Sequence, residues 1–187
     1  MSTMHCSLLS LGCVFGFATS EEQANLTALR ALKIAQRRLR PEVRSKLLSV
    51  TSARTNGNLM PQAWRFVFLD AGTSGHCRVV TVAAKASSEH PGTVEAFSST
   101  KMESVDSLHA IPQNKLLLDS DRVLEQARTA SKLKGIKAVE YRLLQPRSGR
   151  EPLWRLHFYA ETGESVASFQ VGAKTGATSL VVTEAAA

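Results

Sequence analysis

Residues 61–68 read PQAWRFVF and residues 152–158 read PLWRLHF, so a proline, a Trp-Arg pair and an alternating apolar run occur twice in the chain. In each stretch the aromatic and aliphatic residues take every second position, and successive side chains of a β-strand point to opposite faces. This alternation predicts a strand with one face on a core and the other toward solvent, which is typical of antiparallel sheet. The two stretches therefore predict two equivalent strands.

The segments around these stretches recur in the same order. A second alternating run follows each one, VTVAAK at residues 80–85 and FQVGAK at residues 169–174. A pattern with apolar residues three or four positions apart, which indicates an amphipathic helix, precedes each one at residues 26–40 and 121–134. Several matches in one order indicate an internal duplication. We expect an α+β fold of two repeated units, each an α-helix packed on an antiparallel sheet of about three or four strands.

The chain divides accordingly into four segments. Residues 1–20 are interpreted as a signal peptide, residues 21–98 as unit 1, residues 99–118 as a linker without clear periodicity, and residues 119–187 as unit 2. Each unit alone is small for a stable domain, because small domains bury a smaller share of their surface. We therefore expect the two units to pack together.

The second copy resembles a PepSY-like domain, in which a helix with a spaced alanine precedes an antiparallel sheet. The matching residues are Ala127, Pro152, Trp154, Leu156, Phe158, Gly163 and the AKTG run at residues 173–176. The chain departs from this pattern at Gly172, near which the family has an aspartate, and in the first copy, where residues 85–87 read KAS. The resemblance implies an exported protein that binds other proteins or restrains peptidases, and it brings no catalytic residues.

The first twenty residues stand apart because every Lys, Arg, Asp and Glu of the chain lies after them. An apolar run over residues 8–18 has the length of the central region of a secretory signal, and small residues follow at the spacing of a cleavage site. We expect the protein to be secreted or periplasmic. The alternatives are a lipid anchor on Cys13 and a buried first element of the fold. No apolar run is long enough for a transmembrane span.

The formal net charge of +7 is concentrated near the start of unit 1, where residues 21–55 hold eight basic and three acidic residues. Spacings of three and four place several basic residues on one helical face, provided that the helix continues through Pro41: Arg30, Lys33, Arg37, Arg40 and Arg44. This face is either a solvated helix surface or a site for an anionic partner, such as lipid headgroups, a polyanionic polymer or an acidic protein. We do not expect nucleic acid, because no aromatic residue interleaves the run for base stacking.

The rest of the sequence lacks motifs typical of metal sites, phosphate-binding sites or catalytic nucleophiles. The histidines show no metal-ligand spacing, and there is no phosphate-binding glycine loop and no nucleophile elbow. Cys77 has only His76 beside it, and neighbours on a strand face opposite ways. We therefore expect no enzyme, metal or cofactor.

The predicted function is a non-catalytic exported binding or regulatory module of the PepSY-like type, which binds a protein or peptide in the cell envelope; restraint of a peptidase is one form that this binding can take. The alternatives are an enzyme of unknown type and a structural envelope protein that contacts anionic surfaces.

Overall fold

The computed structural model describes residues 26–72, 76–83, 94–98, 109–131, 134–146 and 149–181. The proposed signal peptide, residues 1–20 with Cys13, lies outside the described residues. The segment expected to be a linker, residues 99–118, is described from residue 109 onward.

The described helices and strands occur in two successive blocks, and in each block the helices precede a run of four strands. The helices are α1 (Ala28–Arg37), α2 (Pro41–Arg44), the short 3-10 helix η2 (Gln113–Lys115) and α3 (Ser120–Ser131). The strands are β1 (Leu47–Ser52), β2 (Ala63–Leu69), β3 (Cys77–Ala83), β4 (Val94–Ser98), β5 (Ala138–Leu144), β6 (Leu153–Tyr159), β7 (Ser165–Gly172) and β8 (Thr178–Val181). Within the described ranges no helix combines the length and apolar character needed to cross a membrane.

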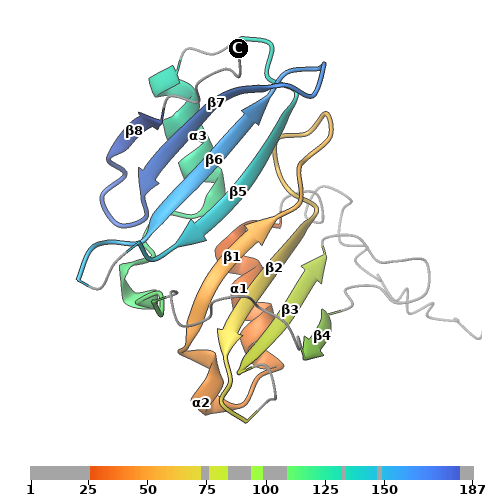
Figure 1. Cartoon of the computed structure of the whole chain (residues 1–187), viewed down its shortest axis with the longest axis vertical. Coiled ribbons are helices and arrows are strands. Elements are labelled where there is room, and N and C mark those ends of the chain that lie inside the picture. Colours follow the sequence, from red (N-terminus) through yellow and green to blue (C-terminus); the bar gives the residue numbers. More distant parts are fainter. Residues whose placement is uncertain are drawn as a thin grey trace, which may run out of the picture.

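The described strands form one antiparallel sheet in the order β4-β3-β2-β1-β5-β6-β7-β8 (Figure 1). The α+β class and the antiparallel pairing predicted from sequence are thus confirmed. The strands expected for the two units join in a single sheet, because β1 pairs with β5 through Val50 opposite Leu143 and Thr51 opposite Arg142. This central pair places β1–β4 on one side of the molecule and β5–β8 on the other.

The helices cover one face of the sheet, and in Figure 1 they lie behind the strands. Helix α1 packs on β2 and β3, whereas α3 packs on β6, β7 and β8. Trp64 and Trp154 are completely buried beneath them, as the alternation of the two stretches predicts, and their rings meet edge to face with centroids 6.2 Å apart. The core is therefore continuous from one side of the molecule to the other.

Helix α1 ends earlier than the sequence pattern indicates. The pattern extends to Arg40, but α1 ends at Arg37 and a new helix starts at Pro41. A residue before proline is confined to extended backbone, and Arg40 has ψ 147°. The helix does not continue through Pro41, so the condition for one helical face with all five basic residues is not met, and Arg40 and Arg44 do not continue the face of α1.

The N-termini of α1 and α3 are joined by hydrogen bonds. The Oγ of Ser120 accepts from the Ala28 N–H at 3.0 Å, and the Oδ1 of Asp119 accepts from the Leu29 N–H at 2.9 Å. Thr27 stands at the N-cap of α1 but its side chain makes no capping bond. The first N–H groups of a helix have no partner within the helix, so α3 supplies the cap that the sequence in front of α1 does not.

Candidate binding surfaces

The structure places the five predicted basic residues on and after α1, all exposed to solvent: Arg30, Lys33 and Arg37 on α1, Arg40 between the helices and Arg44 at the end of α2. Three of them converge on one open hollow of about 470 Å³. We call this feature the basic hollow; its lining residues are Lys33, Gln36, Arg37, Pro41, Arg44, Ser45 and Gln113. Arg30 and Arg40 are not part of it.

Hydrogen bonds between three elements hold the wall of the basic hollow. The Gln36 amide donates to the Gln113 Oε1 at 2.8 Å and to the Arg44 carbonyl at 3.2 Å. The Gln113 amide donates to the same carbonyl at 2.7 Å. The Arg44 Nε donates to the Leu39 carbonyl at 2.8 Å. These bonds fix α2 and η2 against α1 and so set the positions of the cationic side chains.

Charge in the basic hollow is not compensated by the described residues. Lys33, Arg37 and Arg44 form no ion pair with any residue in the described ranges, and no acidic residue lines the hollow. The surface therefore presents three positive charges around a concave space.

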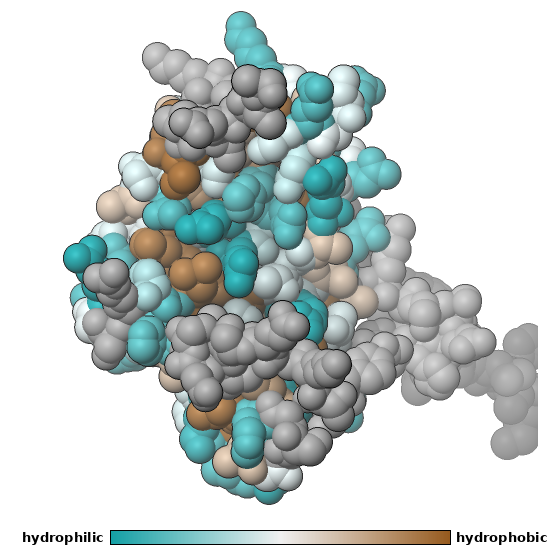
Figure 2. Space-filling model, in the orientation of Figure 1, coloured by the Kyte–Doolittle hydropathy of each residue, from teal (hydrophilic) through white to brown (hydrophobic). Residues whose placement is uncertain are grey.

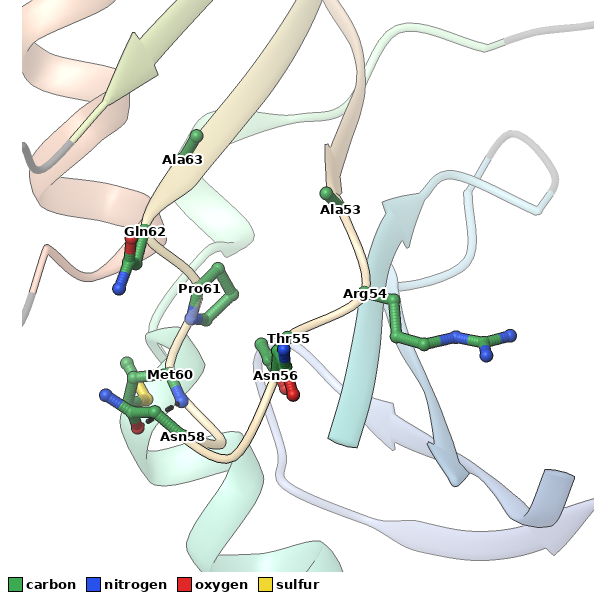
Figure 3. A pocket seen from close by; sticks show the side chains of 9 residues that line it. All are labelled: Ala53, Arg54, Thr55, Asn56, Asn58, Met60, Pro61, Gln62 and Ala63. Atoms are coloured by element: carbon green, nitrogen blue, oxygen red, sulfur yellow. Dashed lines mark hydrogen bonds between the residues drawn. The ribbon is translucent and has the colours of Figure 1, made fainter. Parts of the chain in front are cut away.

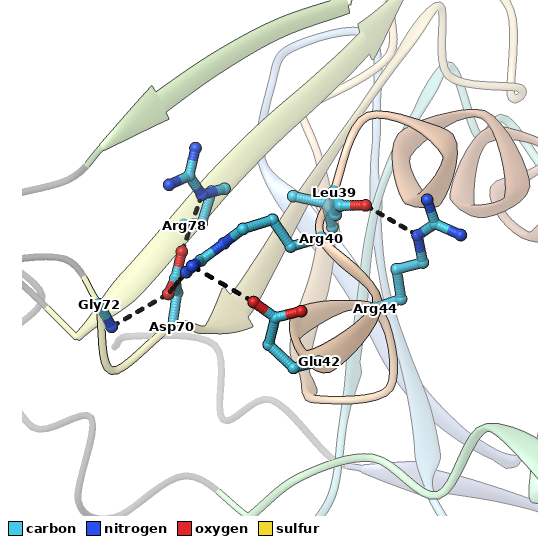
Figure 4. Close-up of polar contacts among 7 residues, drawn as sticks. All are labelled: Leu39, Arg40, Glu42, Arg44, Asp70, Gly72 and Arg78. Carbon is cyan, nitrogen blue, oxygen red and sulfur yellow. Dashed lines mark hydrogen bonds and ion pairs between the residues drawn. The ribbon is translucent and has the colours of Figure 1, made fainter.

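Arg40, which does not line the basic hollow, forms ion pairs within the protein. Its guanidinium contacts Asp70 at 2.8 Å and Glu42 at 3.2 Å, while Arg78 contacts the other oxygen of Asp70 at 3.0 Å. Figure 4 shows Arg40 directed toward Asp70, whereas Arg44 is directed toward the Leu39 carbonyl.

The Asp70 carboxylate is held in its charged form. Burial by itself would raise its pKa, but the Arg78 hydrogen bond, the Gly72 N–H at 3.1 Å and the charges of Arg40 and Arg78 outweigh burial. The pKa of Asp70 consequently lies below its ordinary value.

A second hollow, of about 420 Å³, lies against the loop between β1 and β2 (Figure 3). The loop is attached to β5, because Thr55 and Val139 exchange hydrogen bonds at 3.0 and 2.9 Å. Arg54 is the charged residue of its lining, but its guanidinium stacks on the Tyr159 ring at 3.6 Å and points away from the other lining residues. This hollow therefore presents neutral polar and apolar groups.

The described residues hold no group of three His, Cys, Asp or Glu side chains that could bind a metal ion. The Cys77 side chain is fully buried, and burial raises the pKa of its thiol. It packs with Leu48, Val67 and Val79 in a small cluster on the sheet face opposite the helices. Cys77 thus contributes an apolar contact.

Sequence reasoning missed Gln113 and the Gln36 network of the basic hollow. Gln113 lies in the segment expected to be a linker, where no periodicity marks a contact. Comparison of the chain with family models, curated proteins and solved structures returns no match.

Proposed function

We propose that this protein is a non-catalytic, exported binding module, and that its basic hollow takes an acidic segment of a protein or peptide partner. The observation that carries the proposal is the convergence of Lys33, Arg37 and Arg44 on a concave space without a compensating acid among the described residues. Ligand sites in proteins are concave and of about 300–1,000 Å³, and the hollow falls in this range. Restraint of a peptidase is the role that the PepSY-like resemblance suggests for such a module.

An acidic side chain suits the charge of this surface. Lys33, Arg37 and Arg44 line the same open hollow, so one Glu or Asp side chain can contact more than one of them. Guanidinium groups bind carboxylates with paired hydrogen bonds, which adds geometric specificity to charge attraction. The Gln113 amide keeps a second N–H for a carbonyl of the bound segment, because the described contacts use only one.

One pair of matching contacts and the strand order support the duplicated PepSY-like architecture that we propose. The indole N–H of Trp64 donates to the Leu26 carbonyl at 2.7 Å, and that of Trp154 donates to the Leu118 carbonyl at 3.1 Å. Each carbonyl lies two residues before a helix, α1 or α3. The sheet order runs outward in the same sequence from the central pair, β1 to β4 and β5 to β8.

The structure around Gly172 explains why the chain differs there from the PepSY-like pattern, which has an aspartate near this position. The Glu151 carboxylate accepts from the Lys174 and Thr175 N–H groups at 3.2 and 3.1 Å in the turn between β7 and β8. A Cβ atom at position 172 would lie only 2.5 Å from its Oε1. We infer that Glu151 supplies the carboxylate that an aspartate supplies in the family pattern.

Fluorescence anisotropy with a labelled Glu-rich peptide tests the proposed site. The triple variant Lys33→Gln, Arg37→Gln, Arg44→Gln should bind at least about tenfold more weakly at low salt, since hydrogen bonds to charged groups contribute about 1.5–3 kcal/mol. A matched control changes the same charge elsewhere: Arg122→Gln, Lys134→Gln and Lys174→Gln, all at exposed positions. Equal loss in both variants would show nonspecific attraction and would refute the site. Turnover of any substrate by the purified protein would refute its non-catalytic character.

A second candidate function is adhesion to an anionic surface, which the position of Arg30 favours. Arg30 is exposed on α1 outside the hollow, on the same side as Lys33 and Arg37. Arg30→Gln should weaken binding to anionic vesicles but not to the Glu-rich peptide if this function is correct.

Export is tested separately by mass spectrometry of the protein made in its own host. A mature chain that starts near residue 19 or 21 is expected. Intact Met1 in the cytoplasmic fraction would refute export, and a lipid on Cys13 would identify an anchored form.

A further inference from the structure

The face of the sheet opposite the helices carries a line of arginines. On β2 and β6, Trp64 and Trp154 point into the helix-covered core, so the next residues, Arg65 and Arg155, point to the other face. On β5 the flanking residues of Arg142 are in the core, which places Arg142 on the same face as the other two. We call Arg65, Arg142 and Arg155 the arginine row.

Strand register arranges the row straight across the sheet. Arg65 lies opposite Thr51 of β1, and Thr51 lies opposite Arg142 of β5. Arg142 in turn lies directly opposite Arg155 on β6. Figure 2, in which this face is in front, shows hydrophilic side chains over the part of the face formed by β5 and β6.

The pair of Arg142 and Arg155 is unfavourable by itself. Like charges directly opposite one another on antiparallel strands destabilise a sheet. Neither guanidinium forms an ion pair or a hydrogen bond with any residue in the described ranges. The acidic residue of this part of β5, Glu140, faces His157 in the register and accepts a hydrogen bond from the Tyr159 hydroxyl at 3.1 Å.

Two buried polar groups beside this pair have no hydrogen-bond partner among the described residues. The Nε of Arg155 is shielded from solvent and donates to no acceptor within the described part of the chain. The hydroxyl of Ser168 is also without a partner there, and Ser168 is only 1% exposed. Ser168 lies on β7 opposite His157, on the same face as Arg155 and two residue pairs along the strands from it. Buried donors without acceptors are costly, so the arrangement calls for an acceptor that the described residues do not provide.

We propose that Arg142, Arg155 and Ser168 form a binding site for a phosphate group, free or at the end of a larger molecule. A phosphate offers acceptor oxygens in several directions at once, and two guanidinium groups and a hydroxyl can each donate to a different oxygen. The bound charge relieves the repulsion between Arg142 and Arg155. Arg65, two strands from Arg142, lies in line for a second negative group of the same ligand.

The phosphate site is separate from the basic hollow and does not depend on the proposed function. The hollow is formed by α1, α2 and η2, and the helices cover the other face of the sheet. Loss of one site therefore leaves the other intact.

Titration with inorganic phosphate, observed by ¹H–¹⁵N NMR at constant ionic strength, tests the site. We expect the Arg155 Nε–H signal to shift saturably with phosphate and to be unmoved by chloride. The double variant Arg142→Gln, Arg155→Gln should lose the backbone shifts of β5, β6 and β7. Ser168→Ala should bind about tenfold more weakly, as expected for a hydrogen bond to a charged group. Arg122→Gln with Lys134→Gln, at exposed positions outside both proposed sites, is the control and should bind phosphate like the wild type.

The source of the phosphate is distinguished by two further probes. Glycerol 3-phosphate that binds more tightly than inorganic phosphate indicates a soluble phosphomonoester. Vesicles that contain phosphatidic acid, retained by the wild type and not by the double variant, indicate a lipid headgroup. Equal shifts with chloride and phosphate, or phosphate binding unchanged in the double variant, would overturn the proposal.

Discussion

Replacement of Ser120 by alanine should destabilise a helix that lies far from it in the sequence. The Ser120 hydroxyl accepts from the Ala28 N–H at the start of α1, and both residues are buried. A buried N–H that loses its acceptor costs about 1–3 kcal/mol. Alanine regains a few tenths of this as a better helix former at the start of α3. We expect Ser120→Ala to lower the free energy of unfolding by about 1.5 kcal/mol.

Urea unfolding measures this effect, followed by the fluorescence of Trp64 and Trp154, which are both buried in the native protein. The matched control is Thr27→Ala. Thr27 occupies the N-cap of α1 but makes no side-chain capping bond, so its replacement should cost less than about 0.5 kcal/mol. A Thr27→Ala cost equal to or above that of Ser120→Ala would refute the assignment of the cap to α3.

Two more predictions concern buried groups on and beside β2 and β3. Asp70→Asn should destabilise the protein by about 2 kcal/mol at pH 7, because the charged carboxylate contacts Arg40 and Arg78. Folding lowers the pKa of Asp70, so this stabilisation is present above the ordinary Asp pKa of about 3.9 and is lost as the pH falls through the pKa of the folded protein. The difference in unfolding free energy between the wild type and Asp70→Asn should therefore vanish in acid. A difference that does not depend on pH would contradict the ion pairs. The Cys77 prediction uses a chain with Cys6 and Cys13 replaced by serine. Because the Cys77 thiol is buried and its pKa is raised, it should resist alkylation in buffer and react in urea. Rapid labelling of the native protein would show that β3 is open.

Much of the fold follows from local patterns. The alternation around Trp64 and Trp154 predicts two strands and their buried faces, and both residues are in the core. The apolar spacing before each strand predicts α1 and α3 within a few residues. Pro41 marks the end of α1 because proline restricts the residue before it. These features depend on neighbouring residues, which the sequence displays directly.

The candidate sites are only partly visible in the sequence. The spacing of Lys33 and Arg37 predicts their common helix face, and that part of the basic hollow follows from periodicity alone. Arg44 reaches the hollow only because α2 folds back after Pro41, and Gln113 reaches it from a segment without periodicity. Their approach depends on hydrogen bonds between segments far apart in the chain.

The sequence by itself determined the α+β class, the strand faces and the common helix face of Lys33 and Arg37, because side-chain direction in a helix or strand follows from residue spacing. Tertiary structure alone decided how the two halves meet. The pairing of β1 with β5 merges their strands into one sheet and brings Arg65 and Arg155 into one line with Arg142. A shift of one residue in that pairing would turn Arg142 to the helix-covered face. Register between distant strands is set by the packing of the whole core, which no local stretch of sequence records.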